Sequence, residues 1–184
     1  MQRDLVIKAQ HGDAGAFGTL ATGAIDRLHG VAYRILRDRD RADDATQQAL
    51  VNAWDHLRDL RDPDRFDAWT YRLVVHAAYR EARRENARSD AVRRLVPDGT
   101  VGAEMPAEVA ERDELEQAFK GLSAEHRAVL ALRYYADLPL SEIAEVLDIP
   151  VGTVGSRLHH AIRKMRDQLT RERPPIAIPR QATS

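Results

Sequence analysis

The sequence predicts an all-α protein made of two small helical domains joined by a flexible linker. Apolar residues recur at helical spacing along most of the chain, and no convincing alternating strand pattern occurs. This periodicity fails from Arg88 to Ala107, a stretch with two prolines and two glycines. We expect an N-terminal helical bundle (residues 1–87), a linker (88–107), a C-terminal domain with a helix-turn-helix (108–172) and a disordered tail (173–184).

The N-terminal domain is predicted to hold four helices. The fourth helix follows a polar loop at residues 58–65, and Asp64 is its expected cap. The predicted spans are Asp4–Gln10, Ala14–Leu36, Arg41–Leu57 and Phe66–Ala87.

The C-terminal domain is predicted to begin with a helix over Glu108–Lys120. Ser123 has a hydroxyl suited to capping the next helix, which ends near Tyr135. A short helix (Leu140–Leu147), a tight turn and a longer helix (Val151–Thr170) then predict a helix-turn-helix, whose second helix can enter a major groove.

Composition excludes several classes of protein. The 184 residues include no cysteine, so neither a disulfide framework nor a thiolate metal site is possible. No apolar run approaches the roughly 20 residues of a membrane span, and no secretory signal is evident, so we expect a cytoplasmic protein without membrane insertion. Scattered histidines and the lack of a glycine-rich phosphate loop predict no enzyme, cofactor or metal site.

The net charge of −1 conceals two basic segments. Residues 71–94 hold seven arginines and three acids, and residues 151–173 hold six basic residues and two acids. Local charge matters more to DNA than total charge, so two basic surfaces on an acidic body indicate nucleic-acid binding. Solvated basic helix faces are the alternative.

The last helix is predicted to read duplex DNA. Hydroxyl and basic side chains face away from its apolar stripe and can donate to phosphates and base edges; an ordinary two-helix corner is the alternative. The stripe comprises Val151, Val154, Leu158, Ile162, Met165 and Leu169. The predicted contacts are Thr153, Ser156, Arg157, His159, His160, Arg163 and Lys164.

A strip on the fourth helix is predicted to bind single-stranded DNA. Arg72, His76, Tyr79 and Arg83, here called the melting strip, follow one another at i, i+4, i+7 and i+11. Cations can meet phosphates while aromatic rings stack on unpaired bases; a solvated arginine-rich helix is the alternative. The full predicted set also includes Trp69, Arg80 and Arg84, whereas Phe66, Leu73 and Ala77 are expected in the core.

The acidic third helix is predicted to contact a protein partner. Its mixture of carboxylate, amide and aliphatic groups suits a protein better than DNA, since acids repel phosphates. The same pattern is equally consistent with a half-buried helix of the bundle. Trp54 is expected in the core, and the small alanines of this helix permit close approach of a neighbouring helix. The predicted contacts are Asp43, Asp44, Gln47, Gln48, Leu50 and Val51.

In this order, the three elements resemble the extracytoplasmic-function sigma factors, which carry RNA polymerase to promoters. Residues 44–50 (DATQQAL) look like the family's polymerase-binding segment, and residues 66–73 (FDAWTYRL) look like its promoter-melting helix. Residues 138–144 (LPLSEIA) through 150–158 (PVGTVGSRL) are similar to its reader of the upstream promoter element.

The resemblance implies partners and a mechanism. The N-terminal domain would bind the coiled coil of the largest catalytic subunit of the polymerase core. It would capture an unpaired minus-ten base with help from the loop at residues 60–65. The C-terminal domain would read the minus-thirty-five element as duplex DNA and contact the flap of the second-largest subunit. An anti-sigma factor is a further implied partner.

The sequence also departs from the family pattern. His76 stands where Asn is frequent, Gly155 where a basic residue is usual, and His160 where Arg is frequent. Gln48 replaces a usual Glu and Leu50 a frequent aromatic residue. These departures predict altered promoter reading with polymerase binding retained. A stand-alone helix-turn-helix regulator is the competing hypothesis, although it would need a dimer surface and no sustained heptad seam is present.

Overall fold

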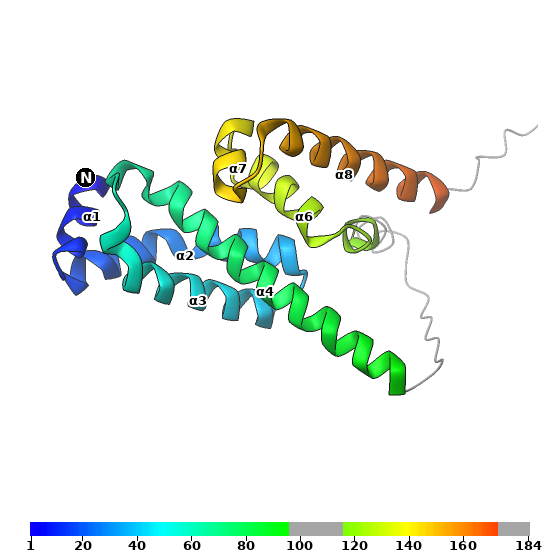
Figure 1. Ribbon diagram of the computed structural model, residues 1–184, viewed down its shortest axis with the longest axis horizontal. Helices are drawn as coiled ribbons and strands as arrows, with labels where there is room; N and C mark the ends of the chain where they lie inside the picture. The colour runs from blue at the N-terminus through cyan, green and yellow to red at the C-terminus, as the bar shows by residue number, and fades with distance from the viewer. Residues whose placement is uncertain (96–115, 173–184) are drawn as a thin grey trace, which may run out of the picture.

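The computed structural model describes residues 1–95 and 116–172, which form helices and no strands (Figure 1). The 3₁₀ turns η1 (Leu57–Asp59) and η2 (Pro63–Arg65) connect α3 to α4, and residues 116–120 are helical. The N-terminal helices are α1 (Gln2–Gln10), α2 (Ala14–Leu36), α3 (Arg39–His56) and α4 (Phe66–Leu95). The C-terminal elements are α6 (Ala124–Leu130), the π-helical turn η3 (Ala131–Tyr135), α7 (Leu140–Leu147) and α8 (Val151–Glu172).

The N-terminal module is a bundle in which α2, α3 and α4 pack on one another. Ala45, Ala49 and Ala53 of α3 are buried, which confirms that the small residues allow close helix approach. Phe66 and Ala77 of α4 are buried as expected, and Leu73 is half-buried against the cluster that contains Ala77. A second cluster joins α1 to the start of α4, which fixes the loop between α3 and α4.

One of the two predicted helix caps is confirmed and the other is wrong. The Ser123 hydroxyl accepts a hydrogen bond from the amide of His126 at 3.3 Å, as predicted for a cap of α6. The Asp64 cap is wrong, because Asp62 accepts the amide of Asp64 at 3.0 Å and begins the 3₁₀ turn that runs into α4. The Asp64 carboxylate instead pairs with Arg3.

The fourth helix is longer than predicted. It continues to Leu95 rather than ending at Ala87, so residues 88–95 belong to α4 and not to the linker. The sequence from Glu81 to Arg94 is rich in Arg, Ala and Glu, which are strong helix formers, so the helix persists without an apolar stripe. The predicted linker from residue 96, the helix start at 108–115 and the tail lie outside the described residues.

The C-terminal module has the predicted helix-turn-helix. The turn between α7 and α8 places Asp148 at a left-handed φ of 54°, a conformation that Asp tolerates better than most residues. The buried face of α8 is rotated from the expected stripe: Val154, Leu158 and Ala161 are buried. Val151 and Ile162 of the predicted apolar stripe remain 48% and 37% exposed, so only part of that stripe is packed.

The C-terminal module lies against the N-terminal bundle. Helix α6 and turn η3 contact α2, and α7 contacts α4 (Figure 1). One continuous cluster of buried residues extends from α2, α3 and α4 into α6, α7 and α8. The melting strip of α4 therefore lies near the C-terminal module.

Candidate functional site

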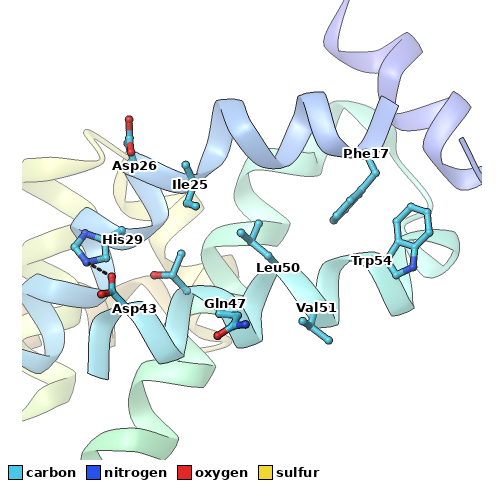
Figure 2. Close-up of a pocket in the computed structure, with 10 residues that line it drawn as sticks. Phe17, Ile25, Asp26, His29, Asp43, Gln47, Leu50, Val51 and Trp54 are labelled. Atoms are coloured by element: carbon cyan, nitrogen blue, oxygen red, sulfur yellow. Dashed lines mark ion pairs between the residues drawn. The ribbon is translucent and has the colours of Figure 1, made fainter. Parts of the chain in front are cut away.

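An open groove lies between α2 and α3 (Figure 2). Its volume is about 730 Å³, and its lining is mostly apolar. Ile25, Val51 and Trp54 are 44%, 48% and 42% exposed there, and Phe17 and Leu50 are partly buried. Apolar side chains gathered in an exposed groove indicate a surface that a protein partner covers. We call this surface the α2–α3 groove.

The two ends of the groove differ in polarity. At one end His29 Nε2 lies 3.0 Å from the Asp43 carboxylate, as the dashed line in Figure 2 marks. At the other end the rings of Phe17 and Trp54 meet in a tilted arrangement with centroids 4.9 Å apart. Trp54 was expected in the core, and that prediction is wrong because α3 turns it toward the groove. A partner would therefore meet an aromatic anchor and a polar rim, an arrangement common in protein interfaces.

The six predicted partner contacts of α3 divide between two hollows. Asp43, Gln47, Leu50 and Val51 line the α2–α3 groove. Asp44 and Gln48 line a neighbouring hollow of about 480 Å³ between α3 and α4, which Gln47 and Val51 also border. The far wall of this second hollow is formed by α4 and includes Arg80, Glu81 and Arg84.

The predicted contacts on α4 therefore face two directions. Arg80 and Arg84 lie beside the acidic helix α3, whereas the melting strip lies on the side of α7. Arg84 pairs with Glu81 at 2.6 Å. Trp69 is half-buried with its ring 6.2 Å from that of Phe66, so packing occupies part of its surface.

The C-terminal module covers part of the melting strip. Arg72 pairs with Asp148 of the helix-turn-helix at 3.5 Å. Tyr79 is largely buried, and its hydroxyl has no hydrogen-bond partner among the residues that the structure describes. This burial, with the charge of Glu125, raises the pKa of Tyr79 well above the usual value. His76 is exposed, yet partial desolvation of its imidazole and the charge of Arg72 lower its pKa. Arg83 is exposed.

The outer face of α8 carries most of its predicted contacts in exposed positions. Ser156, His159, His160, Arg163 and Lys164 are exposed, and the two imidazole centroids lie 6.1 Å apart. The Lys164 ammonium donates a 2.7 Å hydrogen bond to the Gly121 carbonyl oxygen. Thr153 and Arg157 are half-buried. Arg157 lies on the side of Glu125 and Tyr79, where its positive charge acts on both groups.

Comparison with known proteins identifies the family. Residues 22–88 match Sigma-70 region 2, and residues 118–167 match Sigma-70 region 4. The chain is 30% identical to the RNA polymerase sigma-H factor of Pseudomonas aeruginosa, over 92% of this chain and 96% of that one. The chain belongs to the extracytoplasmic-function (ECF) family of RNA polymerase sigma factors. It is a transcription initiation factor, and the stand-alone regulator is not favoured.

Other relatives agree with this assignment. The ECF sigma factor SigL of Mycobacterium tuberculosis is 35% identical over 73% of this chain and 78% of its own length. The ECF sigma factor SigW of Bacillus subtilis is 26% identical over 92% of this chain and 97% of its own length.

Solved structures show the same arrangement of helices. CnrH, solved in complex with the cytosolic domain of CnrY, matches with a TM-score of 0.68 and 25% identity over 94% of this chain and 99% of that one. The sigma factor RpoE of Bartonella quintana, solved with the anti-sigma factor NepR, has a TM-score of 0.65 and 21% identity over 85% of this chain and 98% of its own.

Several groove residues were not predicted from the sequence of this sigma factor. Phe17 and Ile25 belong to the apolar pattern of the second helix, and His29 is one of several histidines scattered along the sequence. The two apolar residues lie eight positions apart, so they share a face of α2, but that spacing also describes an ordinary core stripe. The sequence alone held no signal that separated the two roles.

Within the described residues, no helix is long and apolar enough to cross a bilayer.

Proposed function

We propose that the α2–α3 groove docks this sigma factor on core RNA polymerase, through the coiled coil of the largest catalytic subunit. The exposed apolar lining with Trp54 as an anchor is the observation that carries the proposal. Asp43, Asp44 and Gln48 supply a polar rim that can select a basic or amide-bearing partner helix. The C-terminal module would make a second polymerase contact at the flap of the second-largest subunit.

The α4 face is proposed to hold the melted minus-ten strand. Arg72 and Arg83 would neutralise phosphates, His76 and Tyr79 would stack on or select bases, and the loop at 60–65 would help to hold an extruded base. Support comes from the seven arginines between residues 71 and 94, which give this segment a charge opposite to that of the acidic α3. Arg80, Arg84 and Trp69 would border the same strand.

The exposed face of α8 is proposed to read the minus-thirty-five element. Ser156, His160 and Arg163 are exposed on the outer face of a helix-turn-helix, the geometry that enters a major groove. Gly155 and His160 offer fewer cationic contacts than the family pattern, so duplex affinity would depend more on Arg157, Arg163 and Lys164.

An anti-sigma factor is proposed as a further partner, since RpoE of Bartonella quintana was solved with one. We place the sigma factor in the cytoplasm, where polymerase and promoter DNA are found. In this role the protein binds and positions DNA and carries out no covalent chemistry itself.

Permanganate footprinting of open complexes tests the assignment of α4. Arg83→Ala should reduce the reactivity of unpaired thymines while the amount of bound polymerase stays constant. Arg88→Ala is the matched control, because Arg88 is also exposed but lies about 140° around the helix from Arg83. Equal thymine reactivity in wild type and Arg83→Ala would refute the assignment.

A further inference from the structure

We propose that α1 positions the loop that receives the extruded minus-ten base, with Gln10 as its main positioning residue. The proposed role of the loop at residues 60–65 in holding that base is the premise of this inference. The match to Sigma-70 region 2 begins at residue 22, so α1 lies before the matched segment. None of the contacts proposed above with DNA or polymerase comes from α1.

Gln10 joins α1 to the α3–α4 connection, which we define as residues 57–65. Its side-chain amide donates hydrogen bonds to the carbonyl oxygens of Leu57 and Leu60, at 3.0 and 2.7 Å. A primary amide has two N–H donors, so one side chain can satisfy both carbonyls. These carbonyls belong to the first residue of η1 and to the residue that follows η1. Gln10 therefore fixes the point at which the chain leaves this turn and enters the loop.

The first turn of α1 contacts the far end of the same connection. Arg3 pairs with Asp64, and its guanidinium also lies 4.0 Å from the Asp62 carboxylate. The Gln2 side-chain amide donates a 2.7 Å hydrogen bond to the Asp67 carboxylate at the start of α4. Such exposed contacts contribute little individually. The part-buried amide at the other end of α1 should therefore carry most of the restraint.

The α3–α4 connection has a buried side and an exposed side. Leu57 and Leu60 belong to the same buried cluster as Val6 and Ala9 of α1, and both turns of the connection contact α1 (Figure 1). The exposed side chains are Arg61, Asp62, Asp64 and Arg65. A base can therefore meet the polar side of the loop while α1 holds the opposite side in place.

A loop that is held in one shape before DNA arrives favours base capture. An unrestrained loop loses backbone freedom when it closes around a ligand, and this loss weakens binding. Extrusion of a base already costs free energy, because stacking and pairing are broken. A fixed loop also discriminates between bases, whereas a mobile loop adapts to several. Loss of the α1 contacts should therefore reduce base selection and not only affinity.

Gln10→Glu and Gln10→Met remove the two donors in different ways. The carboxylate has the size of the amide but only accepts hydrogen bonds, so it repels the carbonyls of Leu57 and Leu60, whereas methionine leaves them unpaired. Gln, Glu and Met have similar helix propensities, so α1 should persist in both variants. Lys8→Gln is the matched control, because it lowers the net charge by one unit as Gln10→Glu does. Lys8 is exposed and lies about 160° around α1 from Gln10.

Amide hydrogen exchange of the free sigma factor is the first measurement. The amides of Leu60 and Arg65 donate hydrogen bonds within the connection, at 3.2 and 3.0 Å. We expect them to exchange about 10-fold faster in both Gln10 variants and at the wild-type rate in Lys8→Gln, because the connection opens locally when the donors are lost. Amides of α3 should exchange at the wild-type rate in all variants if the bundle is intact. Unchanged exchange at Leu60 and Arg65 in both Gln10 variants would overturn the positioning role.

Base preference during transcription is the second measurement. Core polymerase with each sigma factor transcribes a promoter at which the wild-type protein starts RNA synthesis, with the minus-ten positions randomised. We expect the ratio of RNA yields between the preferred base and the other bases to fall about 10-fold in both Gln10 variants and to stay unchanged in Lys8→Gln. A defect in folding or docking lowers the yield from every template equally, so it leaves this ratio unchanged.

The two measurements separate the positioning role from the proposed base capture. Faster exchange with an unchanged ratio of yields would overturn the positioning role, because the loop would then loosen without effect on the base. A wild-type sigma factor without a preferred base at any minus-ten position would refute the proposed base capture, and the positioning role with it. Unchanged exchange together with a clear wild-type preference would overturn the positioning role alone.

Discussion

Replacing Val51 by Asp should prevent docking on polymerase while the fold remains intact. Val51 is 48% exposed in the α2–α3 groove, so the substitution should change the free energy of unfolding by no more than about 0.5 kcal/mol. In the complex, the variant loses about 1 kcal/mol of apolar burial from the exposed half of the valine. It also buries an unpaired carboxylate, which costs roughly 3 kcal/mol. The total of about 4 kcal/mol corresponds to roughly 1,000-fold weaker binding.

Fluorescence-anisotropy titration of the labelled sigma factor with core polymerase measures this loss, and thermal melting by circular dichroism checks the fold. Val51→Thr is the matched control, since it keeps the shape of valine and adds only a hydroxyl. We expect this control to weaken binding by about 10-fold, the lower part of the cost of burying a hydroxyl without a partner. A Val51→Asp dissociation constant within about threefold of wild type would refute the role of the groove.

Three further predictions concern stability and DNA binding. Acidification from pH 7.5 to 5.5 should lower the free energy of unfolding. Burial lowers the pKa of His76 and His126 in the folded state, so below pH about 6.5 the unfolded chain binds more protons than the folded one. Urea titrations measure this, and an identical pH dependence in His76→Gln would contradict the contribution of His76. Gly155→Arg should raise the Tm and steepen the salt dependence of duplex binding by about one charge, since a β-carbon there meets nothing within 4 Å; an unchanged salt slope would contradict it. Asp38→Ala should lower the free energy of unfolding by about 1 kcal/mol, because it removes the carboxylate that accepts a hydrogen bond from the Arg41 amide. The same hydrogen bond lowers the pKa of Asp38, so the difference between variant and wild type should fade below pH about 4. A difference that stays constant in acid would contradict this.

Helical periodicity was sufficient to predict most of the fold. The predicted bounds of α2 and α7 agree with the structure, because each has a strong apolar stripe between clear stop signals. The predicted end of α4 was wrong by eight residues, since the sequence there is rich in Arg and Ala and carries no apolar stripe to mark the length of the helix. Local sequence therefore predicted the helices that have an apolar stripe and underestimated the length of one whose end lacks it.

The candidate site was predicted less completely, because it depends on how helices meet. Alanines correctly marked the buried face of α3, but the exposure of Trp54 depends on its position beside Phe17 of another helix. The rotation of α8 has a similar cause: Ala161 packs on the core, so Ile162 stays outside. The apolar periodicity of a single helix is dominated by its large apolar residues, so it predicts that they face the core. Where two helices pack closely, small residues such as alanine occupy the contact instead.

Contact between the modules had no sequence signal at all. The pairing of Arg72 with Asp148 joins residues 76 positions apart, and the stacking of Tyr135 on Arg34 depends on space left by Gly30. Each residue has an ordinary local role in its own helix. The sequence therefore predicted a cationic melting strip on α4 but not that the second module covers part of it.

Transcription by core RNA polymerase on fragmented genomic DNA, with and without this sigma factor, tests the account most directly. We predict discrete RNA 5′ ends that appear only when the sigma factor is added and that disappear with Val51→Asp. Identical 5′ ends with and without the wild-type sigma factor would contradict the account.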